Sequence, residues 1–174
     1  MGIEKGNSYA MNAYAVMLFQ GNVVKQNYKE SERYFKMAIS YGNKYAMNNY
    51  GIDLYEGYGF PVDKIKGLEY LKKAADKGYS NACHRYAFLL YTYHDINVTF
   101  EEIGRYFKMA ADQDHVDAMY YYGLMLENHE IQNPDYLDCM EFFTKAAEKG
   151  NLMALRKLNK DENVQNIFDN EIDI

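Results

Sequence analysis

The stretch AMNNYGIDLYEGYGFPVDKIKGLEYLKKAADKG, residues 46–78, decides the fold. Small and apolar side chains recur there at i, i+4, i+5, i+8 and i+9 from Ala46, which is the spacing of one face of an α-helix. Glycines and Pro61 interrupt this pattern, and a second helical pattern then runs to Gly78. The stretch therefore predicts two helices joined by a turn.

The same pattern recurs along the chain at a period of 36 residues without a gap. Two columns hold alanine, at Ala10, Ala46, Ala82, Ala118 and Ala154, and at Ala38, Ala74, Ala110 and Ala146. A third column holds tyrosine, at Tyr14, Tyr50, Tyr86 and Tyr122. The period predicts repeats over 7–42, 43–78, 79–114 and 115–150, and a partial repeat over 151–160.

Residues typical of helix ends share columns as well. Side chains that cap a helix start are expected at Asn27, Asp63, Thr99 and Asp135. Left-handed residues that end a helix are expected at Gly42, Gly78, Asp114 and Gly150. The predicted helices are 8–20, 28–41, 44–56, 64–77, 80–92, 100–113, 116–128 and 136–149.

These helices predict an all-α fold, an α/α superhelix (solenoid) that forms one domain over residues 1–160. The partial repeat is expected to form a capping helix, and residues 161–174 an acidic tail. Small residues mark where helices approach closely, at Ala15, Gly51, Ala87 and Gly123. The apolar residues of the tail, among acids, are typical either of a docking segment that folds on binding or of a frayed terminus.

Composition excludes several classes of function. The chain has 174 residues and a net charge of −6, so nucleic acid and anionic membranes are repelled on average. No run of 18 apolar residues predicts a membrane span, and the first residues lack a signal-peptide pattern. Cys83 and Cys139 are too far apart in sequence for a paired motif. We expect a reducing, cytoplasmic or otherwise intracellular location. The sequence leaves the oligomeric state open and favours a monomer.

The second repeat resembles the Sel-one-like repeat family, a relative of the tetratricopeptide repeat. The family pattern is A-x3-L-G-x2-Y-x2-G-x-G-V-x2-D-x2-K-A-x2-W-Y-x-K-A-A-x2-G, and matching residues here include Ala46, Gly51, Gly57, Gly59, Asp63, Lys66, Ala74, Ala75 and Gly78. The other repeats keep the alanines and lose the glycine-rich turn. The resemblance, over residues 6–160, implies a non-catalytic adaptor or scaffold that binds other proteins.

In such superhelices the first helix of each pair lines the concave face, so three rows of residues there are candidates for binding a peptide or a helix. The rows are Asn12, Asn48, His84 and Tyr120; Val16, Ile52, Phe88 and Leu124; and Phe19, Tyr55, Tyr91 and Glu127. We select Asn12, Asn48, Tyr55, His84, Phe88, Tyr91, Tyr120 and Glu127 as the partner-binding residues. The asparagines are expected to be exposed because a buried amide without a partner is costly, whereas the second and third rows fit a buried core equally well.

Two other functions stay open. The many tyrosines also suit binding of a glycan or cell-wall polymer, and hydrolysis is the remote alternative, suggested by cysteine-rich relatives whose cysteine pairs are missing here. The four histidines show no metal-binding spacing, and Cys83 and His84 point to different helix faces. We therefore expect no catalytic residue, no cofactor and no metal.

Overall fold

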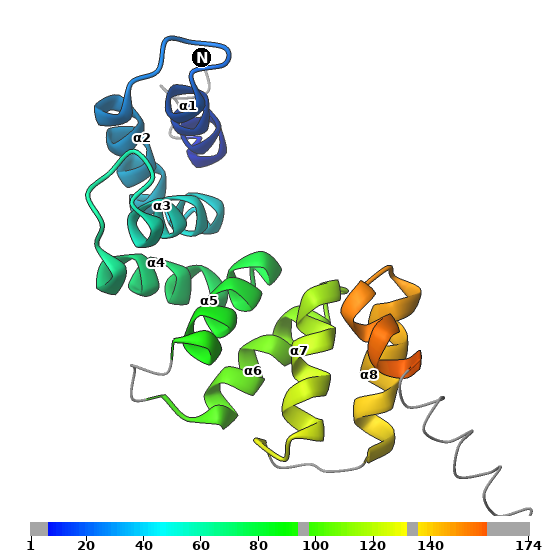
Figure 1. The fold of residues 1–174 in the computed structure, drawn as a ribbon. Helices are drawn as coiled ribbons and strands as arrows, with labels where there is room; N and C mark the ends of the chain where they lie inside the picture. The colour runs from blue at the N-terminus through cyan, green and yellow to red at the C-terminus, as the bar shows by residue number, and fades with distance from the viewer. Residues whose placement is uncertain (1–6, 94–97, 132–135, 160–174) are drawn as a thin grey trace, which may run out of the picture. The chain divides into compact units, whose positions relative to one another are not determined.

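The computed structural model describes residues 7–93, 98–131 and 136–159. Within these ranges every regular element is a helix, so the predicted all-α class is confirmed there (Figure 1). The helices are α1 (Ser8–Gln20), α2 (Tyr28–Ser40), α3 (Lys44–Glu56), α4 (Lys64–Asp76), α5 (Ser80–Thr92), α6 (Phe100–Ala111), α7 (Val116–Glu127) and α8 (Tyr136–Glu148). A further helical segment covers residues 152–159, where the capping helix was predicted.

The second helices begin at the capping residues that the sequence predicts. Side-chain oxygens of Asn27, Asp63 and Thr99 accept backbone N–H groups three residues later, at 3.1, 3.0 and 3.2 Å. Each such cap stabilises a helix by ~1 kcal/mol. The fourth predicted cap, Asp135, lies outside the described residues.

The predicted left-handed helix ends are also confirmed. Gly42, Gly78 and Gly150 have φ of 77°, 69° and 93°, and Asp114 has φ of 65°. Because this conformation stops the helix and turns the chain, every second helix is followed at once by the next first helix.

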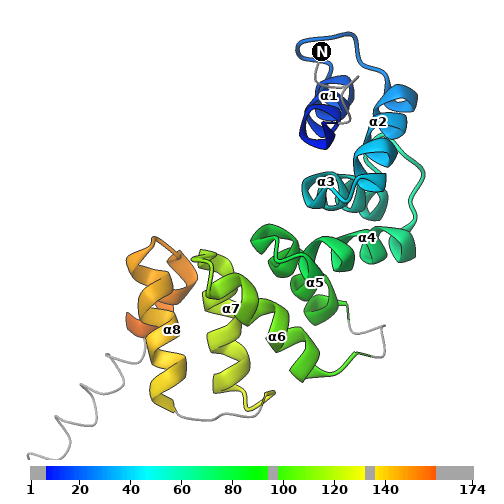
Figure 2. The same cartoon turned by 180° about the vertical axis from the view of Figure 1, so that it is seen from behind.

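The chain divides into two compact units, Met1–Tyr86 and Ala87–Ile174. In unit 1 (residues 1–86), α1 packs on α2 and α3 on α4, and both views show these pairs side by side (Figures 1 and 2). Its core holds the rings of Phe35, Tyr50 and Phe60, with Phe35 stacked on Tyr50 at 5.8 Å and Phe60 edge-on to Tyr50 at 5.3 Å. The Tyr50 hydroxyl donates to Glu32 Oε1 at 2.7 Å, so the one polar atom of this buried ring is satisfied.

Small residues set the distance between the two helices of each repeat in unit 1. In the first repeat the buried Ser31 hydroxyl donates to the Ala15 carbonyl at 2.8 Å. In the second repeat Gly51 faces Gly67, and a Cβ on Gly67 would lie 2.7 Å from the Gly51 carbonyl oxygen. The backbones of α3 and α4 can meet this closely only because neither residue has a side chain.

Unit 2 (residues 87–174) is built in the same way. Its helix α7 packs on α6 and on α8, and Gly123 of α7 lies against the ring of Phe143. Tyr106, Phe107 and Phe143 are fully buried. The predicted packing columns therefore form the core of both units.

We predict that Gly67→Ala destabilises the protein, although alanine favours a helix by ~1 kcal/mol over glycine. The added methyl group meets backbone atoms of α3, so the net loss in free energy of unfolding should be ~1 to 3 kcal/mol. Urea unfolding followed by circular dichroism measures it. Glu69→Ala, at an exposed position of the same helix, is the control. Equal midpoints for both variants would show that α3 and α4 can move apart freely.

Candidate functional site

The predicted asparagine row is largely internal in unit 1. Asn48 is only 6% exposed, so the expectation that it lies at the surface is wrong. Its Nδ2 donates to Asn49 Oδ1 at 3.2 Å, and Asn49 Nδ2 donates to Asn12 Oδ1 at 3.3 Å. The chain of amides links α3 to α1, which explains how the protein tolerates amides between its helices.

One atom of this amide chain has no hydrogen-bond partner. Asn48 Oδ1 is buried and accepts no hydrogen bond within the structure. Tyr55, also selected from the sequence, is 7% exposed, and Lys64 Nζ lies 5.5 Å from its ring centre. Asn12 and His84 are half-buried. Unit 1 thus uses Asn48 and Tyr55 mainly for packing.

In unit 2 the selected aromatic residues form a cluster around Tyr121. The Phe88 and Tyr91 rings lie 5.3 and 6.2 Å from the Tyr121 ring, which stacks on Phe107 at 5.4 Å. The Tyr91 hydroxyl donates to Glu130 Oε1 at 3.4 Å. Burial raises the pKa of both Tyr91 and Tyr121 above the ordinary tyrosine value. Phe88 and Tyr91 are half-buried, so they present only part of their rings to a partner.

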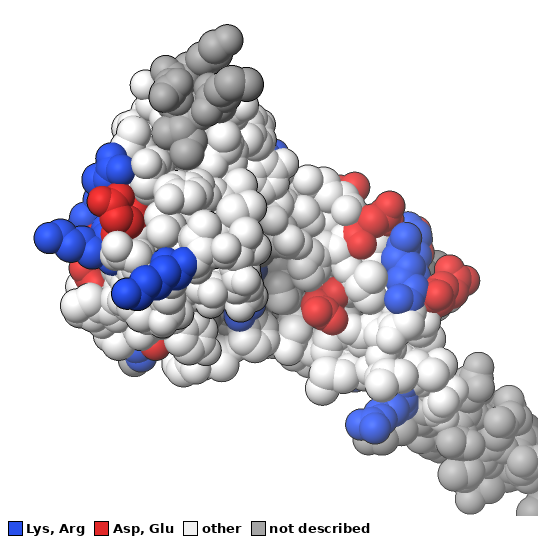
Figure 3. Space-filling view, turned by 90° about the horizontal axis from the view of Figure 1, so that it is seen from above, with Lys and Arg blue, Asp and Glu red and all other residues white. Residues whose placement is uncertain are grey.

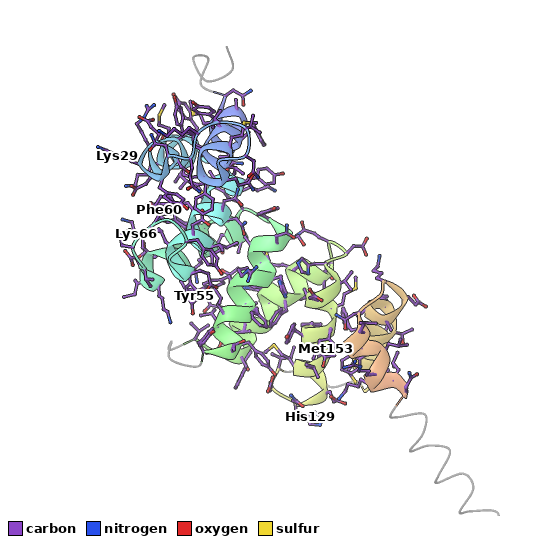
Figure 4. The ribbon with its side chains drawn as sticks, turned by 45° about the horizontal axis from the view of Figure 1, so that its top comes forward. Lys29, Tyr55, Phe60, Lys66, His129 and Met153 are labelled. Atoms are coloured by element: carbon purple, nitrogen blue, oxygen red, sulfur yellow. The ribbon has the colours of Figure 1, made fainter. Side chains whose placement is uncertain are left out.

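A groove in unit 2 joins the predicted row to the partial fifth repeat. It has a volume of about 260 Å³ and is lined by Tyr120, Met153, Arg156 and Lys157. Lys157 forms an ion pair with Glu127, another selected residue. Met153 is 55% exposed and projects from the segment 152–159 (Figure 4). The structure therefore brings Tyr120 and Glu127 together with three residues that the sequence analysis missed.

The sequence contained a signal for one of these missed residues, Arg156. Arg156 stands one period after Tyr120, in the column of Asn12, Asn48 and His84. Treating the last partial repeat only as a cap left this fifth member out. Extending the row by 36 residues would have found it.

The groove offers an aromatic wall, a flexible thioether and two cations. Met153 adapts to irregular apolar groups, and Arg156 can hold a carboxylate in a bidentate geometry. Glu127 fixes Lys157 at the side of the groove. This set of groups suits a peptide that combines an apolar side chain with an acidic one.

A larger cavity of about 500 Å³ lies elsewhere in unit 2, over α6 and α7. Its walls include Arg105, Lys108 and Tyr122, and Lys108 is paired with Asp112 at 2.9 Å. No residue selected from the sequence lines it. Charged groups on the face shown in Figure 3 lie in small clusters separated by uncharged surface.

The histidine and cysteines considered for metal binding or catalysis lie at a helix start or inside the fold. His115 caps α7, because its Nδ1 accepts the Ala118 N–H at 3.3 Å, and burial lowers its pKa. Cys83 and Cys139 are both buried thiols. Among the described residues, no group of three or more His, Cys, Asp or Glu side chains is placed to hold a metal ion. No helix in the described ranges has the length and apolar content needed to cross a membrane.

Asp53 is an unusual residue that the sequence analysis passed over. It stands on α3 in the column of Met17, Leu89 and Met125, where the other repeats have apolar side chains. Asp53 is 9% exposed, and burial raises the pKa of its carboxyl group to about 7. The signal in the sequence was an acidic residue in a repeat column that is otherwise apolar.

Comparison with known proteins identifies the family. The Sel1 repeat model matches residues 8–43, 44–79, 105–115 and 116–151, which is more than half of the chain. The chain belongs to the Sel1 repeat family. The resemblance stated from the second repeat is thereby confirmed.

Two solved structures are similar to this Sel1 repeat protein. One, a protective antigen of uropathogenic Escherichia coli strains that displays an SLR fold, is 25% identical with a TM-score of 0.82, over 90% of this chain and 33% of that chain. The other, a Sel1 repeat protein from Oxalobacter formigenes, is 21% identical with a TM-score of 0.78, over 86% of this chain and 62% of that chain. The second likeness shows the fold alone. This chain thus spans less than two thirds of either, and no curated protein matches it.

Membership of the family carries a general function. Sel1 repeat proteins are generally scaffolds for protein–protein interaction, and the family is generally non-catalytic.

We predict that Asp53 makes the stability of the Sel1 repeat protein depend on pH. Between pH ~4, where an unfolded aspartate titrates, and pH ~7, the folded protein holds a proton that the unfolded chain has lost. Raising the pH through this window therefore lowers the free energy of unfolding. Asp53→Asn, which cannot ionise, should remove ~1 to 3 kcal/mol of this loss.

Urea unfolding at pH 4 and pH 8 measures the effect, with Glu69→Gln at an exposed position as the control. Parallel pH profiles for the wild type and Asp53→Asn would contradict a raised pKa for Asp53.

Proposed function

We propose that this Sel1 repeat protein is a non-catalytic scaffold that binds a peptide or a helix on the face formed by the first helices of its repeats. The groove of unit 2 carries the proposal, because Tyr120 lines it and Glu127 holds its Lys157 in place. A partner segment with an apolar and an acidic side chain would contact Met153 and Arg156 together. Tyr120 is itself only 9% exposed, so it forms the floor of the groove, and the exposed Met153 and Arg156 provide most of the contact.

In unit 1 the first helices offer different candidate contacts. Asn12 and His84 are half-buried and remain candidate contacts, whereas the buried Asn48 is linked to Asn12 through Asn49. In unit 2, Phe88 and Tyr91 of α5 are also half-buried and remain candidate contacts. A reducing compartment is part of the proposal and is supported by the two buried thiols.

A row of tyrosines in unit 1 favours a second candidate function, the binding of a glycan. Tyr9 is 66% exposed, and its ring lies 5.8 Å from Tyr45, which in turn lies 4.8 Å from Tyr79. Lys44 Nζ lies 5.8 and 5.9 Å from the last two rings. Aromatic rings beside polar groups suit sugar rings. A glycan array probed with the wild type and Tyr9→Ala tests this function, and binding to no glycan excludes it.

The proposed groove predicts that Met153→Ala with Arg156→Ala weakens partner capture at least tenfold, as expected when two contacts worth ~1 kcal/mol each are lost. Affinity capture from the source cell's lysate, read by mass spectrometry, compares this variant with the wild type. Both residues are exposed, so melting should not change.

Thr144→Ala with Lys149→Ala, at exposed positions of unit 2 outside the groove, is the matched control and should capture the same protein as the wild type. Equal capture by the groove variant and the control would place the binding surface elsewhere. If the wild type retains no protein, the result counts against the proposed protein partner and favours binding of a glycan.

A further inference from the structure

The last helix of the described residues, 152–159, carries an exposed apolar surface. Leu152, Met153 and Leu155 are 66%, 55% and 45% exposed, whereas Ala154 is fully buried. Asn151 fixes the start of this helix, since its Oδ1 accepts the Ala154 N–H at 2.8 Å and its Nδ2 donates to Asp117 Oδ1 at 2.9 Å. The helix is therefore anchored on one side and apolar on the other.

Comparison with the other repeats shows that this exposure is abnormal. Residues in the column of Leu155 are almost completely buried, with exposures of 1% at Met11, 6% at Met47, 0% at Cys83 and 4% at Met119. Met11 packs in the cluster that contains Phe35 and Ala38 of the second helix α2. Leu155 stays open because no second helix follows the last helix among the described residues.

A cation lies within this apolar surface. Leu152, Leu155 and Arg156 stand at i, i+3 and i+4, so they share one face of the last helix. Arg156 is exposed, and it stands three residues after Met153. An occupant of this surface therefore needs apolar side chains and at least one acid.

The segment 161–174 has this chemistry. It contains five acidic residues and no basic one. Its apolar residues Val164, Ile167, Phe168 and Ile172 stand at i, i+3, i+4 and i+8, which is the spacing of one helix face. The segment lies outside the described residues, but its connection is short, because residues 160–163 suffice for a helix–helix turn.

We propose that residues 161–174 dock on the last helix of the same chain, with Ile167 and Phe168 against Leu152 and Leu155 and the acids beside Arg156. Docking covers the surface that a second helix covers in the complete repeats. The docking does not rest on the proposed function.

Amide hydrogen exchange of the full-length protein, read by mass spectrometry at low micromolar concentration, tests the docking. Amides of residues 164–172 should exchange about tenfold more slowly in the wild type than in Leu155→Ser or Phe168→Ser. Val23→Ser, at a 75% exposed apolar position of unit 1, is the matched control and should leave this exchange unchanged. Peptides from α7 and α8 should keep their protection in every variant, which shows that unit 2 stays folded.

The charged part of the contact is tested in the same assay. Arg156→Glu should also speed exchange of residues 164–172, whereas Lys149→Glu, an exposed cation off this surface, should not.

Two results would overturn the proposal. The first is equal exchange of residues 164–172 in the wild type and in Phe168→Ser. The second is protection that disappears on tenfold dilution, because a second copy of the chain then provides the contact. Since no partner is needed, failed lysate capture with normal protection of residues 164–172 counts against the proposed function alone.

Discussion

The close approach of the two helices in each repeat is the constraint on which the rest of the structure depends. Gly51 and Gly67 bring the backbones of α3 and α4 together, and Ala15 with Ser31 does the same for α1 and α2. Larger side chains at these positions would push the helices apart and expose the ring of Tyr50, which is 1% exposed. Because the helices lie so close, the side chains between them fill the core of each repeat, and the exposed side chains of the first helices are not needed for this packing.

The repeat, the helix limits and most capping residues could be predicted because they depend on local chemistry that recurs every 36 residues. An asparagine or aspartate at a helix start, or a glycine after a helix end, acts on its own backbone. The observed helices end no more than two residues before the predicted ones, as at α6, which ends at Ala111. Local signals in the sequence were therefore sufficient to predict the helices without knowledge of how they pack.

The candidate site was harder to predict because exposure depends on what the neighbouring helix contributes. Asn48 was expected at the surface, yet its amide is buried. Hydrogen bonds from Asn48 to Asn49 and from Asn49 to Asn12 make this burial tolerable. Arg156 belongs to the same column, but it is exposed because few residues follow it in the described part of the chain. One column thus holds a buried amide, a half-buried imidazole and an exposed guanidinium. The column of a residue predicts which face of its helix it occupies. It does not predict how exposed the side chain is.

The two units use their similar folds for different chemistry. Unit 1 links its first helices by amides and contains the buried acid Asp53, whereas unit 2 fills the corresponding space with Tyr91, Tyr121 and Phe107. An aromatic cluster is rigid, so it holds the nearby Tyr120 at a fixed place beside Met153 and Arg156. Rigid walls lose little conformational entropy when a partner binds, which is why the proposed binding groove is the one in unit 2. The helix 152–159 adds the exposed side chains of Leu152, Leu155 and Arg156 to this unit.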